Sequence, residues 1–177
     1  MGVMIMYVRA ATIKDAEGIA HVHVDTWRTT YLNIMSPAYL ATLTYDIRKE
    51  LWQKHLSDKE KHIFVLENEQ AEIVGFAACN QRPLEPHIGD LTSIYIIKEE
   101  QQKGYGRLLM KALFQTFNEL GCEKVFVEVL VENDTRHLYE YFGAKIVEID
   151  TMNLGTQELE FFIYKWDSVK NVLAQLA

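Results

Sequence analysis

Apolar and polar positions alternate along the chain in two different rhythms. Short runs rich in β-branched and aromatic residues, bounded by polar turns, predict β-strands. Two of these runs flank the polar turn at residues 68–70, which predicts a β-hairpin. The predicted strands lie at residues 3–9, 63–67, 73–79, 90–97, 125–131, 146–149 and 159–164.

Other segments repeat apolar residues every three or four positions, which predicts amphipathic helices. The clearest of them extends from Leu108 to Leu120, and Gly121 follows it as a typical helix-ending residue. Thr12, and Ser36 before a proline, are typical of helix starts. Helices are therefore predicted after residue 12, from residue 37 with a break near residue 45, and at 108–120, 134–142 and 169–176.

The order of these elements predicts a single α/β domain over residues 1–177, built on a mixed sheet. No internal repeat and no linker rich in Pro, Gly or Ser interrupts the chain. The adjacent hairpins argue against a doubly wound parallel sheet.

Composition and charge narrow the class of protein. Of 177 residues, 49% are hydrophobic and 24% are charged, which is typical of a globular domain. The formal net charge of -7 argues against a nucleic-acid partner, because phosphates attract a basic surface, and mildly favours a cationic substrate such as a polyamine. The apolar N-terminal stretch is too short for a membrane span and lacks the basic start of a signal peptide, so no membrane partner is expected.

Cysteine and histidine usage points to no metal site. Cys79 and Cys122 are far apart in apolar contexts, which predicts two buried, reduced thiols and a cytoplasmic location. His21 and His23 are two positions apart and face different sides of a helix, so solvated surface positions are favoured over a metal-binding pair. Met1-Gly2 lacks the downstream Ser or Thr of a myristoylation site.

The sharpest local signal is a glycine-containing loop between a predicted strand and the strongest helix. Backbone N–H groups at a helix N-terminus attract anions, and glycines allow close approach, so a phosphate or pyrophosphate is the expected guest. The alternative is a helix that simply begins with glycines. A dinucleotide motif fails because Leu109 replaces its third glycine, and a nucleoside-triphosphate motif fails because no Lys is followed by Ser or Thr. The loop contains Gln101, Gln102, Lys103, Gly104, Tyr105, Gly106 and Arg107.

Gln101, Gly104 and Gly106 fit the Q/R-x-x-G-x-G/A motif of the GNAT superfamily of N-acetyltransferases, which the chain resembles. The similarity extends to residues 9–16, 26–31, 38–40, 94–96 and 132–143, and covers the chain to about residue 164. Two departures are Ala144, where many members have Phe, and Lys98, where Pro is frequent. The resemblance implies a mixed, mostly antiparallel sheet flanked by helices. It also implies transfer of an acetyl group from acetyl-CoA to a primary amine by direct attack in a ternary complex.

The resemblance also implies roles for individual residues. The backbone of Ile94, Tyr95 and Ile96 would hold the pantetheine and thioester, and the loop at 101–107 the pyrophosphate. Tyr139 matches the residue that protonates the leaving thiolate. The alternative interpretation is that Tyr139 is packed in the core and has no catalytic role. Asn133 matches the residue that positions the cofactor or the helix beside it. The alternative interpretation is that Asn133 only caps the N-terminus of the helix predicted from residue 134.

The base and the acceptor site are less strongly specified. Asp90 matches the acidic residue that some members use as the general base. The alternative interpretation is that Asp90 is a turn residue at the end of a strand. Glu85 and His87 are nearby substitutes, and ordered water can also serve. Trp27 and Tyr31 share a helix face and match residues that border the acceptor pocket; core packing is the alternative.

Two other functions remain open from the sequence. One is a catalytically silent module that binds acetyl-CoA, and the other is a nucleotide-binding α/β protein of another family. The expected partner is an amine on a small molecule, a peptide or a protein. A homodimer is suggested by the resemblance alone. Covalent catalysis by a cysteine is not favoured, because neither Cys79 nor Cys122 has a His nearby in the sequence to activate it.

Overall fold

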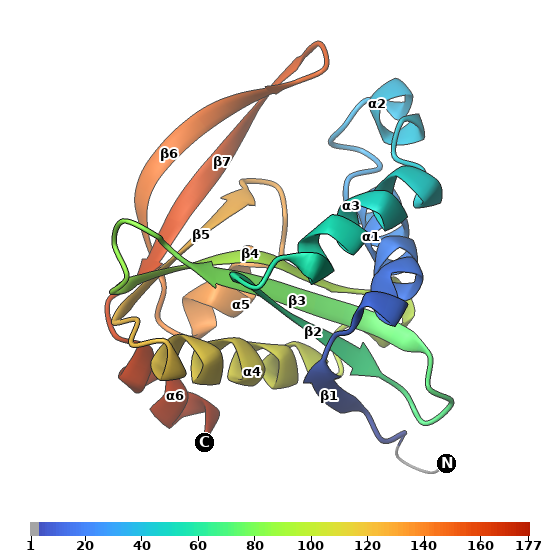
Figure 1. Ribbon diagram of the computed structural model, residues 1–177. Coiled ribbons are helices and arrows are strands. Elements are labelled where there is room, and N and C mark those ends of the chain that lie inside the picture. The colour runs from blue at the N-terminus through green and yellow to red at the C-terminus, as the bar shows by residue number, and fades with distance from the viewer. Residues whose placement is uncertain (1–3) are drawn as a thin grey trace.

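One twisted sheet forms the centre of the computed structural model, which describes residues 4–177 (Figure 1). The strand order is β1-β2-β3-β4-β5-β7-β6, and β4 with β5 is the one parallel pair among six pairings. The predicted mixed, mostly antiparallel sheet is therefore confirmed. The strands are β1 (Tyr7–Ala10), β2 (Lys61–Glu67), β3 (Ile73–Gln81), β4 (Ile88–Ile96), β5 (Lys124–Leu130), β6 (Lys145–Leu154) and β7 (Gln157–Trp166).

Helices cover both faces of the sheet (Figure 1). On one face, apolar residues of α1 and α3 pack on β2 and β3 around Phe76. On the other, α4, α5 and α6 pack in the larger core around Phe114 and Trp166. The helices are α1 (Ala16–Thr30), α2 (Pro37–Ala41), α3 (Tyr45–Ser57), α4 (Tyr105–Glu119), α5 (Arg136–Tyr141) and α6 (Val169–Leu176), with short 3₁₀ turns at Ile13–Asp15 and Lys98–Glu100.

Most of the predicted elements are present, and their ends have visible causes. Ser36 accepts a hydrogen bond from the Tyr39 N–H and caps α2, while Gly121 takes a positive φ of 80° just after α4. The first strand is shorter than predicted within the described residues, and residues 1–3 lie outside them. The β6–β7 hairpin is longer than predicted, and nearly all of β6 is exposed.

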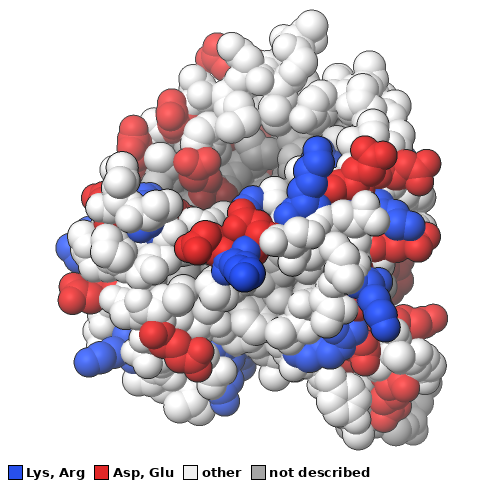
Figure 2. Space-filling model, viewed as in Figure 1, with Lys and Arg blue, Asp and Glu red and all other residues white. Residues whose placement is uncertain are grey.

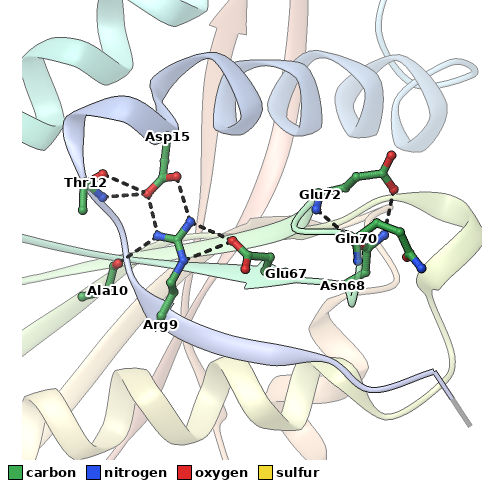
Figure 3. A network of polar contacts seen from close by, with 8 residues as sticks. All are labelled: Arg9, Ala10, Thr12, Asp15, Glu67, Asn68, Gln70 and Glu72. Atoms are coloured by element: carbon green, nitrogen blue, oxygen red, sulfur yellow. Dashed lines mark hydrogen bonds and ion pairs between the residues drawn. The ribbon is translucent and has the colours of Figure 1, made fainter.

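A network of charged side chains fixes the start of α1 to the sheet (Figure 3). The Arg9 guanidinium donates to Asp15 at 2.8 and 3.0 Å and to Glu67 at 2.8 and 3.1 Å. Asp15 also accepts from the Thr12 N–H at 2.7 Å, and the Arg9 hydrogen bonds hold the pKa of this carboxyl below its usual value. Strand β1, strand β2 and the N-terminus of α1 are thereby joined at one point.

His23 corrects one prediction. It was expected on the surface, but it is buried, and its Nδ1 accepts a hydrogen bond from the Trp52 indole N–H at 2.9 Å. Its ring also stacks on Tyr95. Burial lowers the pKa of His23 to about 3, so the ring is neutral at pH 7. The two cysteines, Cys79 and Cys122, are buried and unbonded to each other, as predicted.

Candidate active site

The central feature of the site is a gap between the two parallel strands. Strands β4 and β5 pair only from Ile88 to Leu91, where Leu91 lies opposite Val127. Beyond that point β4 continues along β3, and β5 continues along β7. The β4 edge from Thr92 to Ile96 therefore faces β5 without pairing to it.

A β-bulge lies where the strands separate. Leu91 is opposite Cys79 and Ser93 is opposite Ala78, so Thr92 is the extra residue. The Thr92 hydroxyl donates to the Ala78 carbonyl at 3.1 Å. Because bulges bend the strand that carries them, this one accounts for β4 turning away from β5.

The glycine loop closes one end of this gap. Gly104 has a φ of +83° at the N-terminus of α4, and a Cβ placed there would meet nothing within 4 Å. The backbone N–H groups of residues 102–106 have no backbone acceptor within the described residues. The Gln101 amide donates to the Ile96 carbonyl at 2.7 Å and ties the loop to the end of β4. An open, anion-attracting helix N-terminus results.

The two basic side chains of the loop are already engaged. The Lys103 ammonium lies 3.0 Å from a Glu100 carboxylate oxygen, and the Arg107 guanidinium donates to the Gln175 carbonyl at 2.9 Å. Backbone N–H groups, rather than free basic side chains, are thus the principal donors that the loop offers.

A cavity of about 610 Å³ follows the gap from the glycine loop. It brings together most of the residues predicted to bind a cofactor, whereas Lys103 and Tyr105 do not line it, and Tyr105 packs against the main core. The predicted residues along the cavity are Ile94, Tyr95, Ile96, Gln101, Gln102, Gly104, Gly106, Arg107 and Asn133.

A second cavity of about 180 Å³ lies on the side of the gap formed by β5 and the β6–β7 hairpin. Trp27, Tyr31 and Tyr139, all predicted as site residues, line it together with β5 and the β6–β7 hairpin. In Figure 2 the surface is hollowed between that hairpin and the helices opposite, and acidic and basic side chains lie at the edge of the hollow. The residues that line both cavities are Ile94, Tyr95, Asn133 and Thr135.

Tyr139 lies beside the point where the cavities meet. Its side chain is only 4% exposed, with its ring edge-on to Trp166, and it makes no hydrogen bond to the described residues around it. Burial, with a smaller effect of Tyr95, raises the pKa of Tyr139 above its usual value. The phenol is therefore a neutral O–H donor with no competing partner.

Asn133 and Tyr31 form a buried link between distant parts of the chain. The Asn133 amide donates to the Tyr31 hydroxyl at 2.9 Å, and its side-chain oxygen accepts from the Thr135 N–H at 3.0 Å. Asn133 thus orders the loop before α5 and also holds Tyr31 of the α1 C-terminus. Both residues are at most 5% exposed.

Comparison with known proteins decides the family. The model of the acetyltransferase (GNAT) family matches residues 23–144. The uncharacterized N-acetyltransferase YuaI of Bacillus subtilis is 33% identical over 155 residues, covering 86% of this chain and 88% of that protein. The chain belongs to the GNAT family. The predictions of GNAT membership and of an acetyltransferase enzyme are confirmed.

Other GNAT proteins are similar over part or all of the chain. The spermidine N(1)-acetyltransferase of Vibrio cholerae is 32% identical over 102 residues, or 56% of this chain and 58% of that one. The structure of a PaiA N-acetyltransferase from Thermoplasma acidophilum, in complex with coenzyme A, superposes with a TM-score of 0.76 at 19% identity. It covers 93% of this chain and 99% of its own, which confirms the GNAT fold.

Two carboxylates are candidates for the base of a GNAT reaction. Asp90 lies at the start of β4, where both of its oxygens accept from Arg82 at 2.9 Å, and it lines neither cavity. Its role as base stays a prediction. Glu128 was missed by the sequence reasoning, yet it lines the smaller cavity one residue beyond the last β5 residue paired to β4. The available signal was one carboxylate inside the apolar run at 125–131.

Two further features were searched for within the described residues. Residues 4–177 contain no group of three His, Cys, Asp or Glu side chains placed to hold a metal ion. Across the same residues, no helix is both long and apolar enough to cross a membrane.

Proposed function

We propose that the protein transfers an acetyl group from acetyl-CoA to a primary amine by direct attack within a ternary complex. The observation that carries this proposal is the meeting of two cavities at the gap between β4 and β5, with the unpartnered Tyr139 hydroxyl beside it. One cavity suits a long phosphorylated cofactor and the other a smaller acceptor. The curated relatives include a spermidine N(1)-acetyltransferase and a ribosomal-protein alanine N-acetyltransferase, whose names both denote amine acceptors.

The residues along the larger cavity fit acetyl-CoA. The free N–H groups of residues 102–106 and the open space at Gly104 suit a pyrophosphate. The unpaired β4 edge from Thr92 to Ile96 offers backbone groups to the amides of the pantetheine arm. When bound, acetyl-CoA supplies an activated acetyl group as a thioester with a thiolate leaving group.

The side chains at the junction suit the proton transfers of the reaction. A carboxylate at the smaller cavity accepts a proton from the acceptor ammonium, directly or through water, which frees the nitrogen lone pair for attack. We favour Glu128 for this step and keep Asp90 as the second candidate, reached through water. As the new C–N bond forms and the C–S bond breaks, Tyr139 donates its proton to the departing sulfur, and the second proton of the attacking nitrogen passes through water to the Tyr139 oxygen, which leaves a neutral amide and restores the phenol.

The proposal predicts that acetyl-CoA and a primary amine together release free thiol, which a thiol reagent detects. Tyr139→Phe should lower kcat about 100-fold or more, because a positioned general acid contributes about 10²–10⁴-fold. The Kd for acetyl-CoA should change little, because the hydroxyl acts on the sulfur and the ring remains. Unchanged kcat would remove Tyr139 as the acid, and thiol release by no amine would favour a silent acetyl-CoA-binding module.

Glu128→Gln and Asp90→Asn form a matched pair for the base. If Glu128 accepts the proton, Glu128→Gln should lower kcat/KM strongly, and Asp90→Asn should have a small effect. The reverse pattern would assign the base to Asp90. A cytoplasmic location and a homodimer stay predictions, which fractionation of cells and ultracentrifugation would test.

A further inference from the structure

The smaller cavity is lined mainly by apolar and aromatic side chains. Trp27, Met35, Leu154 and Phe161 form walls from α1, the segment after it and the β6–β7 hairpin. Its volume of about 180 Å³ is close to the roughly 150 Å³ of an engineered apolar cavity that binds benzene. The space therefore suits one ring or one short branched alkyl group.

The same cavity carries one negative charge. Among the described residues that line it, Glu128 is the one carboxylate and none is Lys, Arg or His. No ion pair within residues 4–177 involves Glu128. The carboxylate is thus free to pair with one ammonium group, and no second carboxylate among the described residues lines the cavity itself.

Hydrogen bonds join the hairpin that lines the cavity to the segment after α1. The Ser36 N–H donates to the Gln157 side-chain oxygen at 2.7 Å, and the Gln157 amide donates to the Ile34 carbonyl at 3.3 Å. These bonds join the segment after α1 to the hairpin, and Met35 packs in the same cluster as Leu154. Two walls of the cavity are therefore held together by hydrogen bonds and by apolar packing.

We propose that the acceptor is a small primary monoamine that carries one apolar group of about the size of a benzene ring. Glu128 pairs with its ammonium group, and the apolar group lies against Trp27 and Phe161. This inference rests on the proposed function, because it assigns the smaller cavity to the acceptor. It disfavours polyamines, despite the net charge of the chain and the named substrate of the Vibrio cholerae relative.

The test measures kcat/KM of the full chain with acetyl-CoA and a matched set of amines. 2-Phenylethylamine should exceed ethylamine by about 10- to 100-fold, because burial of an aromatic side chain contributes about that factor. Butylamine should exceed 1,4-diaminobutane, and 2-phenylethylamine should exceed spermidine. Equal rates for 2-phenylethylamine and ethylamine, or a preference for spermidine or for a peptide amine, would overturn the inference.

A charge placed at the cavity should change the preference. Met152 lines the cavity at 44% exposure, whereas Ile149 is 60% exposed on the opposite face of the same strand and outside the lining. Met152→Glu should shift selectivity from butylamine toward 1,4-diaminobutane, because it adds a second carboxylate, and Ile149→Glu should not. An equal shift in both variants, or none in Met152→Glu, would count against the cavity as the acceptor site.

Calorimetry with acetyl-CoA separates the two possible failures. Suppose that acetyl-CoA binds, but thiol is released only with polyamines or peptides, or with none of the amines. The monoamine inference is then wrong, while the cofactor site stands. If folded protein does not bind acetyl-CoA, the proposed function itself fails.

Discussion

Gly104 and Gly121 provide an unusually well matched pair of substitutions. Gly104 begins α4 with a φ of +83°, and Gly121 follows the end of the same helix with a φ of +80°. A Cβ added at either position would meet no atom of residues 4–177 within 4 Å. The pair differs in one functional respect, because Gly104 lines the larger cavity and Gly121 lines neither cavity.

The expected stability cost is the same at both positions. An L-residue in the left-handed region costs about 1–2 kcal/mol, and the smaller entropy of the unfolded alanine chain offsets about 0.4–1 kcal/mol. Gly104→Ala and Gly121→Ala should therefore each lower the free energy of unfolding by roughly 1 kcal/mol. For a domain of this size, Tm should fall by about 2–4 °C in a thermal unfolding measurement.

The expected binding effects differ. Gly104→Asp places a carboxylate where we propose that the pyrophosphate lies. Two unit charges about 4 Å apart repel by about 1 kcal/mol in water and about 4 kcal/mol near a protein surface. Calorimetry should therefore show acetyl-CoA affinity reduced about 5-fold or more in Gly104→Asp, with a smaller reduction in Gly104→Ala.

Gly121→Asp is the control for the added charge, and its affinity should match that of the unchanged protein. The reasoning would be refuted if Gly104→Asp bound acetyl-CoA normally, or if Gly121→Asp weakened binding as much. Unequal stability of the two alanine variants would instead show that one glycine has contacts that the geometry does not reveal.

Three other predictions concern groups around the site. The pKa of His23 is about 3 in the folded protein and about 6.5 in the unfolded chain. Between pH 3 and pH 6.5, the His23 ring is therefore protonated in the unfolded chain and neutral in the folded protein. Stability should therefore fall by about 1.4 kcal/mol per pH unit as pH drops below 6.5, and urea unfolding of His23→Gln should show a flatter profile; identical profiles would contradict it. Tyr31→Phe should cost about 1–3 kcal/mol by leaving the Asn133 amide without its partner, and a double-mutant cycle with Asn133→Ala that gave no coupling would count against this. Gln157→Ala should raise KM for the amine more than Kd for acetyl-CoA, because the hairpin borders the smaller cavity alone, and equal changes would argue otherwise.

Local signals explain why much of the fold was predictable. Ser36, Gly121 and Gly143 act within a few residues of themselves, so the ends of their helices follow from the sequence. The full length of the β6–β7 hairpin does not. Its outer strand is almost entirely exposed, so it lacks the alternation of buried and exposed residues that marks a strand.

Site residues could be predicted where they belong to a contiguous sequence motif. Site residues that come together only through packing of distant segments could not. The glycine loop and Tyr139 lie beside one gap in the sheet, and their roles stay predictions. Glu128 and the burial of His23 depend on which strands and helices meet, and no local pattern specifies that. The divergence of β4 from β5 likewise depends on a single bulge at Thr92.

Calorimetric titration of the full chain with acetyl-CoA, with ATP and NAD as controls, tests the central claim most directly. The account predicts one binding site for acetyl-CoA per chain and no comparable binding of ATP or NAD. Well-folded protein that gave no heat with acetyl-CoA, or that bound ATP or NAD equally well, would contradict it.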